Sequence, residues 1–398
     1  MLGLPPLLSL IASYYLQNHF IDNFATDIQI KQFNYKHGWF SSQAQIEFDL
    51  NAQNAAIKTQ NTINHGPVIW SLLMTKPFEA FSLYQINSLF EFSGNSGLVD
   101  NSTEKGTART RVRYTGTTSP EIHHPGLTLR LFNSHFFADL PEISSEFLSD
   151  GTMLVNFTAN LIDVKDRFSN IYTTQPVVAI SFDSEMTLPS RLQAHALNVW
   201  GSSGPDEFSA KDFTFTGSLE KKDSRYRLTS EATADLFNFN KAAFNQVTIN
   251  IIVSDLDETL IAYFSANYPE LSSALRKNHW LILLKHFSQI VKRLNHHQPQ
   301  FKLQANGLYA DHPVNINFLG KLVTNKQSDL NPFSILENLE MNLDANIPIG
   351  LVDEIKQPEI TEFLALMSNN GLLISKNGSY HSKLSFQGAK LKTAHDVL

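Results

Sequence analysis

The sequence contains no cysteine, and it has few charged side chains for its length. The absence of cysteine excludes disulfide scaffolds, thiol catalysis, zinc–cysteine sites and iron–sulfur clusters. Charged residues make up 17% of the 398 positions, and 38 acidic against 31 basic side chains give a formal charge of −7. Proteins that bind nucleic acid normally carry a basic excess or a clustered basic face, so this class is not expected.

The chain is rich in hydrophobic and aromatic side chains. Hydrophobic residues account for 42% of the sequence, which excludes a mainly disordered chain. The length allows one large or two ordinary domains. Phenylalanine occurs 29 times, against 11 tyrosines and 4 tryptophans. So many aromatic side chains present a large apolar area that has to be buried.

The N-terminal region, residues 1–24, opens on an uncharged segment over 2–16. A membrane-spanning helix needs ~20 apolar residues, whereas the apolar core of a signal peptide needs ~7–15 and follows basic residues. The segment is short for a span and has no basic residues before it. Two interpretations stay open on these residues alone: a buried N-terminal helix, or the C-terminal part of a signal anchor.

Apolar and polar residues alternate strictly along much of the chain. The pattern is clear over 44–50, 153–161, 314–318 and 339–347. Such strands place one face on a core and the other in water, which is typical of antiparallel sheets. Further strands are expected over 57–63, 109–114, 128–132, 177–182, 212–219, 225–233, 244–253, 300–305 and 380–386. Asn377 and Gly378 predict a two-residue turn between the last two strands.

The sequence therefore predicts a mainly β protein of the α+β class, with long, curved antiparallel sheets and a few flanking amphipathic helices. Helical spacing of apolar residues predicts a helix over 279–295, one over 257–276 that breaks near Pro269, and one over 352–369. The polar stretch 201–211 separates a β-rich half over 25–200 from a second over 201–398, which holds helices near 257–295 and 352–369.

Clusters of arginine and histidine give weaker signals. Arg109, Arg111 and Arg113 lie along one strand face and are expected to be solvated at a sheet edge. His123 and His124 are expected in a solvated loop, because adjacent strand residues point to opposite faces and form no pair of ligands. No metal site and no cofactor are expected.

One motif suggests catalysis. Asp255-Leu-Asp257-Glu-Thr follows an apolar strand and resembles the DxDxT motif of haloacid-dehalogenase phosphatases. The resemblance implies that Asp255 attacks phosphorus, that Asp257 is the general acid–base, and that Mg²⁺ neutralises the phosphate. The remaining motifs do not follow in the required chain order. We therefore favour the alternative that these acidic residues cap the next helix.

A second resemblance covers most of the chain. Tyr35, Gly38, Phe40, Ser41 and Ser42 match the Y-x-x-G-x-F-S-S signature of the YdgA-like family, bacterial envelope proteins whose biochemical function is not established. The family's His-Gly-Pro step is matched by His65, Gly66 and Pro67. Residues 13–20 resemble the segment that closes the family's N-terminal membrane anchor. The resemblance implies that residues 1–24 are an anchor and that the rest lies in the periplasm, tethered to the inner membrane.

The signature residues are expected to be structural. Gly38 gives a permissive backbone before the rings of Trp39 and Phe40, which are expected to anchor the start of a strand. Ser41 and Ser42 are expected to satisfy local backbone groups.

These observations together favour a binding or scaffold protein over an enzyme. The expected partners are the inner membrane, through the N-terminus, and a lipid or another apolar ligand held by a long one-sided sheet. A homo-oligomer, an envelope protein bound at an exposed sheet edge, and an Mg²⁺-dependent phosphatase are the alternatives.

Overall fold

The computed structural model describes residues 28–38, 40–50, 55–65, 82–93, 105–113, 117–131, 134–148, 150–165, 169–183, 189–222, 225–276, 282–283, 285–286, 289–290, 299–322, 339–355, 362, 366–388 and 390–393. The chain divides into two compact units. Unit 1 comprises residues 1–189 and 194–205, and unit 2 comprises residues 190–193 and 206–398. Each unit is described by itself.

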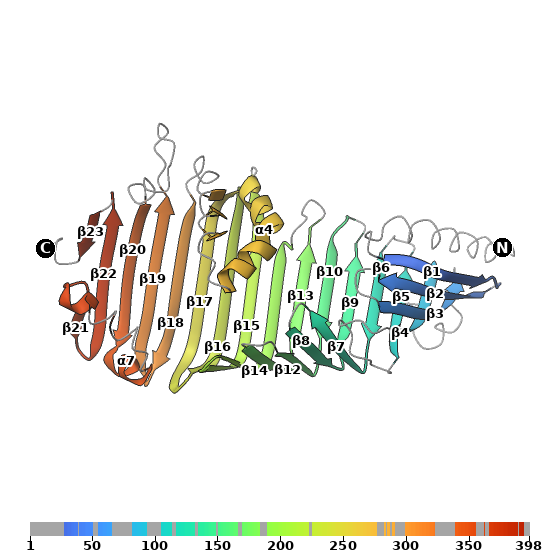
Figure 1. The fold of residues 1–398 in the computed structure, drawn as a ribbon, viewed down its shortest axis with the longest axis horizontal. Coiled ribbons are helices and arrows are strands. Elements are labelled where there is room, and N and C mark those ends of the chain that lie inside the picture. The colour runs from blue at the N-terminus through green and yellow to red at the C-terminus, as the bar shows by residue number, and fades with distance from the viewer. Residues whose placement is uncertain are drawn as a thin grey trace. The chain divides into compact units, whose positions relative to one another are not determined.

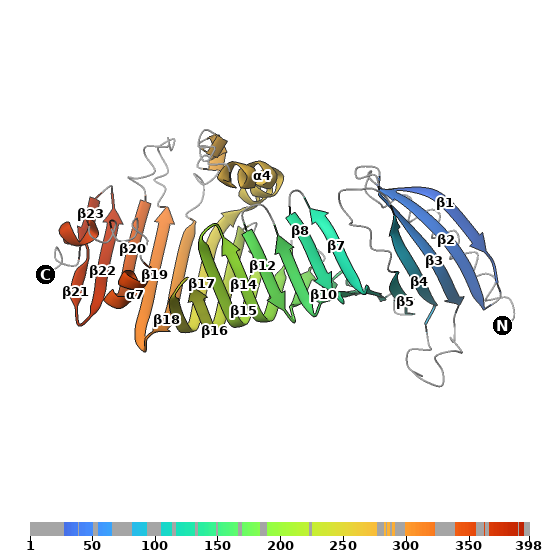
Figure 2. The same cartoon turned by 60° about the horizontal axis from the view of Figure 1, so that its bottom comes forward.

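Unit 1 is built from antiparallel strands (Figures 1 and 2). They are β1 (Ile28–Lys36), β2 (Ser41–Leu50), β3 (Ala55–His65), β4 (Tyr84–Ser93), β5 (Gly106–Val112), β6 (Thr118–His123), β7 (Gly126–Leu131), β8 (Ser134–Asp139), β9 (Glu142–Phe147), β10 (Met153–Thr158), β11 (Leu161–Lys165), β12 (Ser169–Thr174), β13 (Val177–Phe182) and β14 (Arg191–Ser203). Strands β1 to β6 pair in sequence order, and Figure 2 shows β1 to β5 as a curved sheet.

From β6 to β13, the strands of unit 1 come in consecutive pairs of short segments, and a two-residue break separates the two segments of each pair. β6 pairs with β9, β9 with β10 and β10 with β13, while β7 pairs with β8, β8 with β11, β11 with β12 and β12 with β14. The interruptions coincide with two-residue breaks, two of which have a residue at positive φ before proline: Leu140 (φ 45°) and Gln175 (φ 48°). Because proline donates no hydrogen bond and positive φ breaks the pleat, each strand ends there and resumes as a separate segment.

Unit 2 holds longer strands, which Figure 1 shows side by side. They are β15 (Asp206–Lys222), β16 (Arg225–Phe239), β17 (Ala242–Asp257), β18 (Gln300–Tyr309), β19 (His312–Leu322), β20 (Leu339–Pro348), β21 (Ile374–Lys376), β22 (Ser379–Gln387) and β23 (Lys390–Thr393). Each of β15 to β19 pairs with the next, β20 pairs with β22, and β22 also pairs with β21 and β23.

The helices of the described residues lie in unit 2. Helix α4 (Glu258–Arg276) starts where β17 ends, and α7 (Ile349–Ile355) follows β20 directly. Residues 282–283, 285–286 and 289–290 are also helical. The Tyr263 hydroxyl lies 2.6 Å from His286 Nδ1, which joins α4 to this segment.

The mainly β, antiparallel fold class is confirmed, and most expected strands occur. Some local predictions were wrong. The strand expected over 153–161 is divided between β10 and β11, because Ala159 and Asn160 occupy one of the breaks. Helix α4 continues through Pro269 without interruption. The turn at Asn377 and Gly378 forms with both residues at positive φ, but β23 follows β22, so these are not the last two strands.

The arginine and histidine expectations were also partly wrong. Strand β5 pairs on both sides, so it is not an edge, and Arg111 is buried. His124 is buried at the break after β6, where its Nδ1 accepts a hydrogen bond from Gly126 N at 3.2 Å. His123 is exposed, as expected, and lies 3.7 Å from Glu142. The anchor expected over 1–24 lies outside the described residues.

Candidate functional site

The signature residues of the first strands form a buried polar contact. Ser42 lies on β2 opposite Ile63 of β3, and His65 is two residues further along β3 on the same face. The Ser42 Oγ and His65 Nε2 atoms are 2.8 Å apart, and Gly38 N donates to Ser42 Oγ at 3.3 Å. His65 N donates to the carbonyl oxygen of Phe40 at 2.9 Å. The contact joins the start of β2 to the end of β3.

A serine beside a histidine is a combination used for nucleophilic catalysis, but this pair lacks the other requirements. Both residues are about 2% exposed or less, so a substrate has no access to the hydroxyl. Within the described part of the chain, His65 Nδ1 has no hydrogen-bond partner, so no carboxylate orients the ring. The geometry favours the structural role expected from the sequence.

The other signature residues are placed as follows. Tyr35 lies on β1 with its ring edge-on to His37 at 4.6 Å, and Ser41 begins β2 opposite Asn64. The Phe40 side chain is 60% exposed, so the expectation that its ring anchors the strand was wrong, and only its carbonyl group does so. Trp39, Gly66 and Pro67 lie outside the described residues.

Burial of His65 predicts a pH dependence of folding. Desolvation, with a smaller contribution from the neighbouring His37, holds the pKa of His65 below its ordinary value of 6.5. The unfolded chain therefore takes up a proton at a higher pH than the folded one. We expect the free energy of unfolding to fall as the pH drops below 6.5 and to level off below the pKa of the folded state.

This dependence is measured by urea denaturation between pH 7.5 and pH 5. His65→Gln is expected to lose the part that belongs to His65, whereas His195→Gln, at an exposed histidine of β14, is the control and is expected to keep it. Identical profiles for wild type and His65→Gln would contradict the assignment.

The two aspartates of the phosphatase-like motif have structural partners. Asp255 adopts a φ of 60° at a bulge in β17 and lies 3.1 Å from Arg225 Nη1. Asp257 precedes α4 and accepts a hydrogen bond from Thr259 N at 2.5 Å, the geometry of a helix N-cap. Strand β17 is antiparallel to both of its neighbours, whereas the phosphatase motif is expected in a parallel sheet. No group of His, Asp or Glu residues in the described ranges could hold a metal ion.

The cap predicts the effect of removing it. Asp257→Ala is expected to lower the stability of unit 2 by about 1 kcal/mol, because one backbone N–H of α4 loses its acceptor. Asp255→Asn, which alters an exposed ion pair, is expected to cost less than about 1 kcal/mol. Thermal denaturation followed by circular dichroism measures both changes. Hydrolysis of p-nitrophenyl phosphate with Mg²⁺ that disappears in Asp255→Asn would instead favour the phosphatase alternative.

Unit 2 carries a set of apolar rows that cross the sheet. Residues directly opposite one another in an antiparallel sheet lie on the same face. Three successive rows on one face, here called the apolar face, follow from the pairings. The first row is Leu219, Leu228, Val253, Phe301, Gly320, Met341, Phe386 and Leu391. The second is Gly217, Ser230, Ile251, Leu303, Phe318, Leu343, Leu384 and Thr393. The third is Phe215, Ala232, Ile249, Ala305, Ile316, Ala345 and Ser382.

Rings on the apolar face lie close to the sheet. A Cβ atom added to Gly320 would lie 3.2 Å from the Phe318 ring, and one added to Gly217 would lie 3.4 Å from the Phe215 ring. The rings therefore cover the glycines of the neighbouring row. Phe301 and Phe318 also contact each other, with ring centroids 5.8 Å apart. The result is a continuous hydrocarbon surface without a charged side chain.

This surface is only partly covered. Leu228, Ile249 and Phe301 are each 37% exposed, although their rows lie within the sheet. Over β20 and β22, Met367 and Leu373 pack against Leu384 and its neighbours, so that part of the face is covered, whereas Leu391 on β23, at the end of the first row, is 49% exposed. A longer exposed stretch lies over β16 to β18.

The opposite face of the same strands is polar. The row between the second and third apolar rows consists of Thr216, Glu231, Asn250, Gln304, Asn317, Asp344 and Lys383. Leu319 is an exception on this face and is 42% exposed. The two faces of unit 2 thus differ sharply in chemistry.

The sheet edges are less suited to binding. Among the described strands, β1 pairs only with β2, and β23 pairs only with β22. Lysines occur on both, at Lys31 and Lys36 and at Lys390 and Lys392. Lysine on an edge strand opposes the addition of another strand.

Part of unit 1 matches the model of a known family. Residues 15–165 match DUF945, a bacterial protein family of unknown function. The DUF945 match spans the signature residues and strands β1 to β11. It supports the expected relation to an uncharacterised bacterial family, whereas the narrower YdgA-like assignment stays a prediction. No curated protein and no solved structure matches the chain.

A membrane-spanning helix is not found in the described residues, which leave out the N-terminal region.

Sequence patterns indicated a one-sided sheet, but they did not indicate which apolar residues share a row. That depends on the pairing register of strands far apart in the chain. The alternation over 314–318 and 339–347 was the available signal.

Proposed function

We propose that this protein binds lipid acyl chains on the apolar face of unit 2, as a non-enzymatic protein tethered to the inner membrane and facing the periplasm. The observation that carries the proposal is the partial exposure of three consecutive apolar rows that contain no charged side chain. Contiguous exposed apolar patches larger than a few hundred Å² mark interaction sites on soluble proteins.

The dimensions of the apolar face suit a hydrocarbon chain. The exposed stretch over β16 to β18 covers two spacings between paired strands, which corresponds to about 10 Å. Three rows along a strand occupy about 13 Å. An acyl chain has no hydrogen-bonding group. Most side chains of the apolar face are aliphatic or phenylalanine, and few carry a hydroxyl, so the face needs no hydrogen-bonding partner from its ligand. A peptide ligand would leave its backbone polar groups unsatisfied there.

The proposed location rests on the sequence. The uncharged segment over 2–16 and its resemblance to an envelope-protein anchor favour tethering to the inner membrane. A chain without cysteine tolerates an oxidising compartment such as the periplasm.

Native mass spectrometry tests lipid binding. The full chain, purified without detergent and mixed with phosphatidylethanolamine vesicles that are then removed, is expected to carry one or more lipid masses. Wild-type protein that remains free of lipid at all vesicle concentrations would contradict the proposal.

A further inference from the structure

The polar face of strands β1 to β6 in unit 1 carries a groove of about 710 Å³. Cross-strand pairings place two rows of side chains along it. One row is Lys36, Gln43, Thr62, Asn87, Arg109 and Glu121, and the other is Asn34, Gln45, Gln60, Leu89, Thr107 and His123. Six strands span five spacings, or about 24 Å. The groove is thus longer than a single small molecule needs, and it is here called the amide groove.

Amide side chains form the central wall. The side chains of Gln43, Gln45 and Gln60 are exposed and make no hydrogen bond within the described part of unit 1, so their amide groups are available to a ligand. Each carboxamide carries a hydrogen-bond donor, the NH₂ group, and an acceptor, the carbonyl oxygen, on the same carbon atom. Neighbouring hydroxyl groups on a sugar ring present the same combination.

One acceptor in the wall is buried without a partner. Gln85 is 4% exposed and donates from Nε2 to Asn87 Oδ1 at 3.0 Å, while its Oε1 atom has no hydrogen-bond partner among the described residues. An unsatisfied buried acceptor costs about 1–3 kcal/mol. Oε1 is closed to solvent, so a ligand hydroxyl donates to it only after the Gln85 side chain turns into the groove, whereas a phosphate or carboxylate, which only accepts, gains nothing there.

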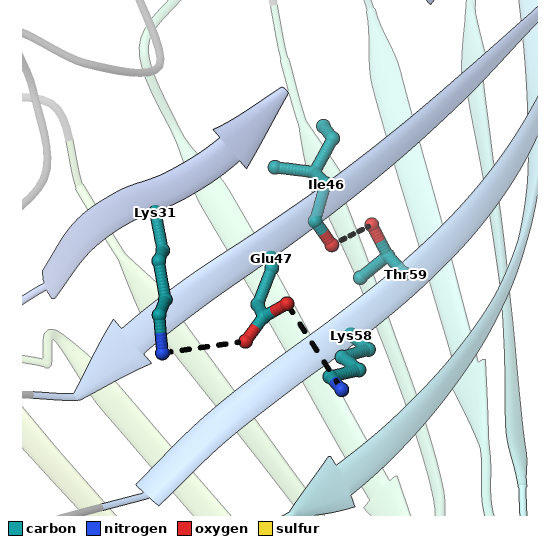
Figure 3. A network of polar contacts seen from close by, with 5 residues as sticks. All are labelled: Lys31, Ile46, Glu47, Lys58 and Thr59. Carbon is teal, nitrogen blue, oxygen red and sulfur yellow. Dashed lines mark hydrogen bonds and ion pairs between the residues drawn. The ribbon is translucent and has the colours of Figure 1, made fainter. Parts of the chain in front are cut away.

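Charges of opposite sign lie close together beside the groove. Glu47 lies between Lys31 and Lys58, at 3.7 Å and 4.0 Å, on strands β1 to β3 (Figure 3). In the groove itself, Arg109 and Glu121 are cross-strand neighbours. These opposite charges offset one another, which reduces the attraction for a strongly charged ligand. Leu89, 46% exposed in the centre of its row, gives an apolar contact for the C–H face of a sugar ring.

We propose that the amide groove binds a neutral oligosaccharide. Its chain lies across strands β1 to β6, and its hydroxyl groups bond to the glutamine amides and to Gln85 Oε1. This site is separate from the proposed lipid surface of unit 2, so either assignment can fail without the other.

The proposal is tested by probing an array of neutral and acidic oligosaccharides with the full chain. Calorimetric titration then measures the affinity for the neutral oligosaccharide that binds most strongly. The double variant Gln43→Leu, Gln60→Leu is expected to weaken binding at least tenfold. Gln300→Leu, an exposed glutamine on β18 in unit 2, is the matched control and is expected to change affinity less than twofold. Gln43 and Gln60 are exposed, so the variants should fold, and circular dichroism verifies this.

Three outcomes would overturn the proposal. The first is that no neutral oligosaccharide on the array is bound. The second is binding confined to acidic oligosaccharides. The third is an equal loss of affinity in the double variant and in Gln300→Leu.

Discussion

Leu228→Glu is expected to weaken the binding of a fluorescent fatty acid at least about tenfold. Leu228 lies in the first apolar row and is 37% exposed, so the change places a carboxylate where a hydrocarbon chain would lie. Burying a leucine side chain contributes about 1.5–3 kcal/mol. Losing that contact and desolvating a charge together exceed the ~1.4 kcal/mol that corresponds to tenfold in affinity.

The chain supplies a matched control for this substitution. Leu319 is 42% exposed on the opposite face and is paired with Lys302, the neighbour of Phe301. Leu319→Glu makes the same chemical change at similar exposure and is expected to leave the affinity within twofold of wild type. Fluorescence titration measures both. Equal effects of the two substitutions would show that binding does not depend on the apolar face.

Gly38→Ala is expected to destabilise unit 1 by about 1–3 kcal/mol. A Cβ atom at this position would lie 1.9 Å from the carbonyl oxygen of Ser41, which is backbone at the first residue of β2. The strand would have to move, and the Gly38 N to Ser42 Oγ hydrogen bond depends on its position. The Ser42–His65 contact would shift with it.

Gly126→Ala is the control for this prediction. A Cβ atom at Gly126, on β7 of the same unit, would lie 3.6 Å from the Phe137 ring, an ordinary van der Waals distance. The expected change is within about 0.5 kcal/mol. Urea denaturation followed by far-ultraviolet circular dichroism measures both variants. Equal midpoints would contradict the role assigned to Gly38.

Local patterns in the sequence predicted much of the fold. The alternation over 44–50 and 339–347 predicted β2 and β20, because burial of one face imposes a period of two whatever the strand pairs with. Asn377 and Gly378 predicted a turn, because both tolerate positive φ. Asp257 was expected to cap a helix, and its side chain does so.

Features that depend on register could not be predicted in the same way. Ser42 and His65 are separated by 22 residues, and their contact follows from the pairing of Ser42 with Ile63. The rows of the apolar face require correct pairing of strands over 172 positions of sequence, from Leu219 to Leu391. The breaks at Leu140 and Gln175 depend on residues that seldom adopt positive φ. The exposure of Phe40 and the burial of His124 depend on tertiary packing.

The central claim is that an acyl chain lies on the apolar face of unit 2. Photo-crosslinking of the full chain with a diazirine-labelled palmitic acid, followed by peptide mapping with mass spectrometry, tests it most directly. We predict labels on residues of the apolar rows in β16 to β18, such as Leu228, Ile249 and Phe301. Labels confined to unit 1, or to the polar face around Asn250 and Asn317, would contradict the claim.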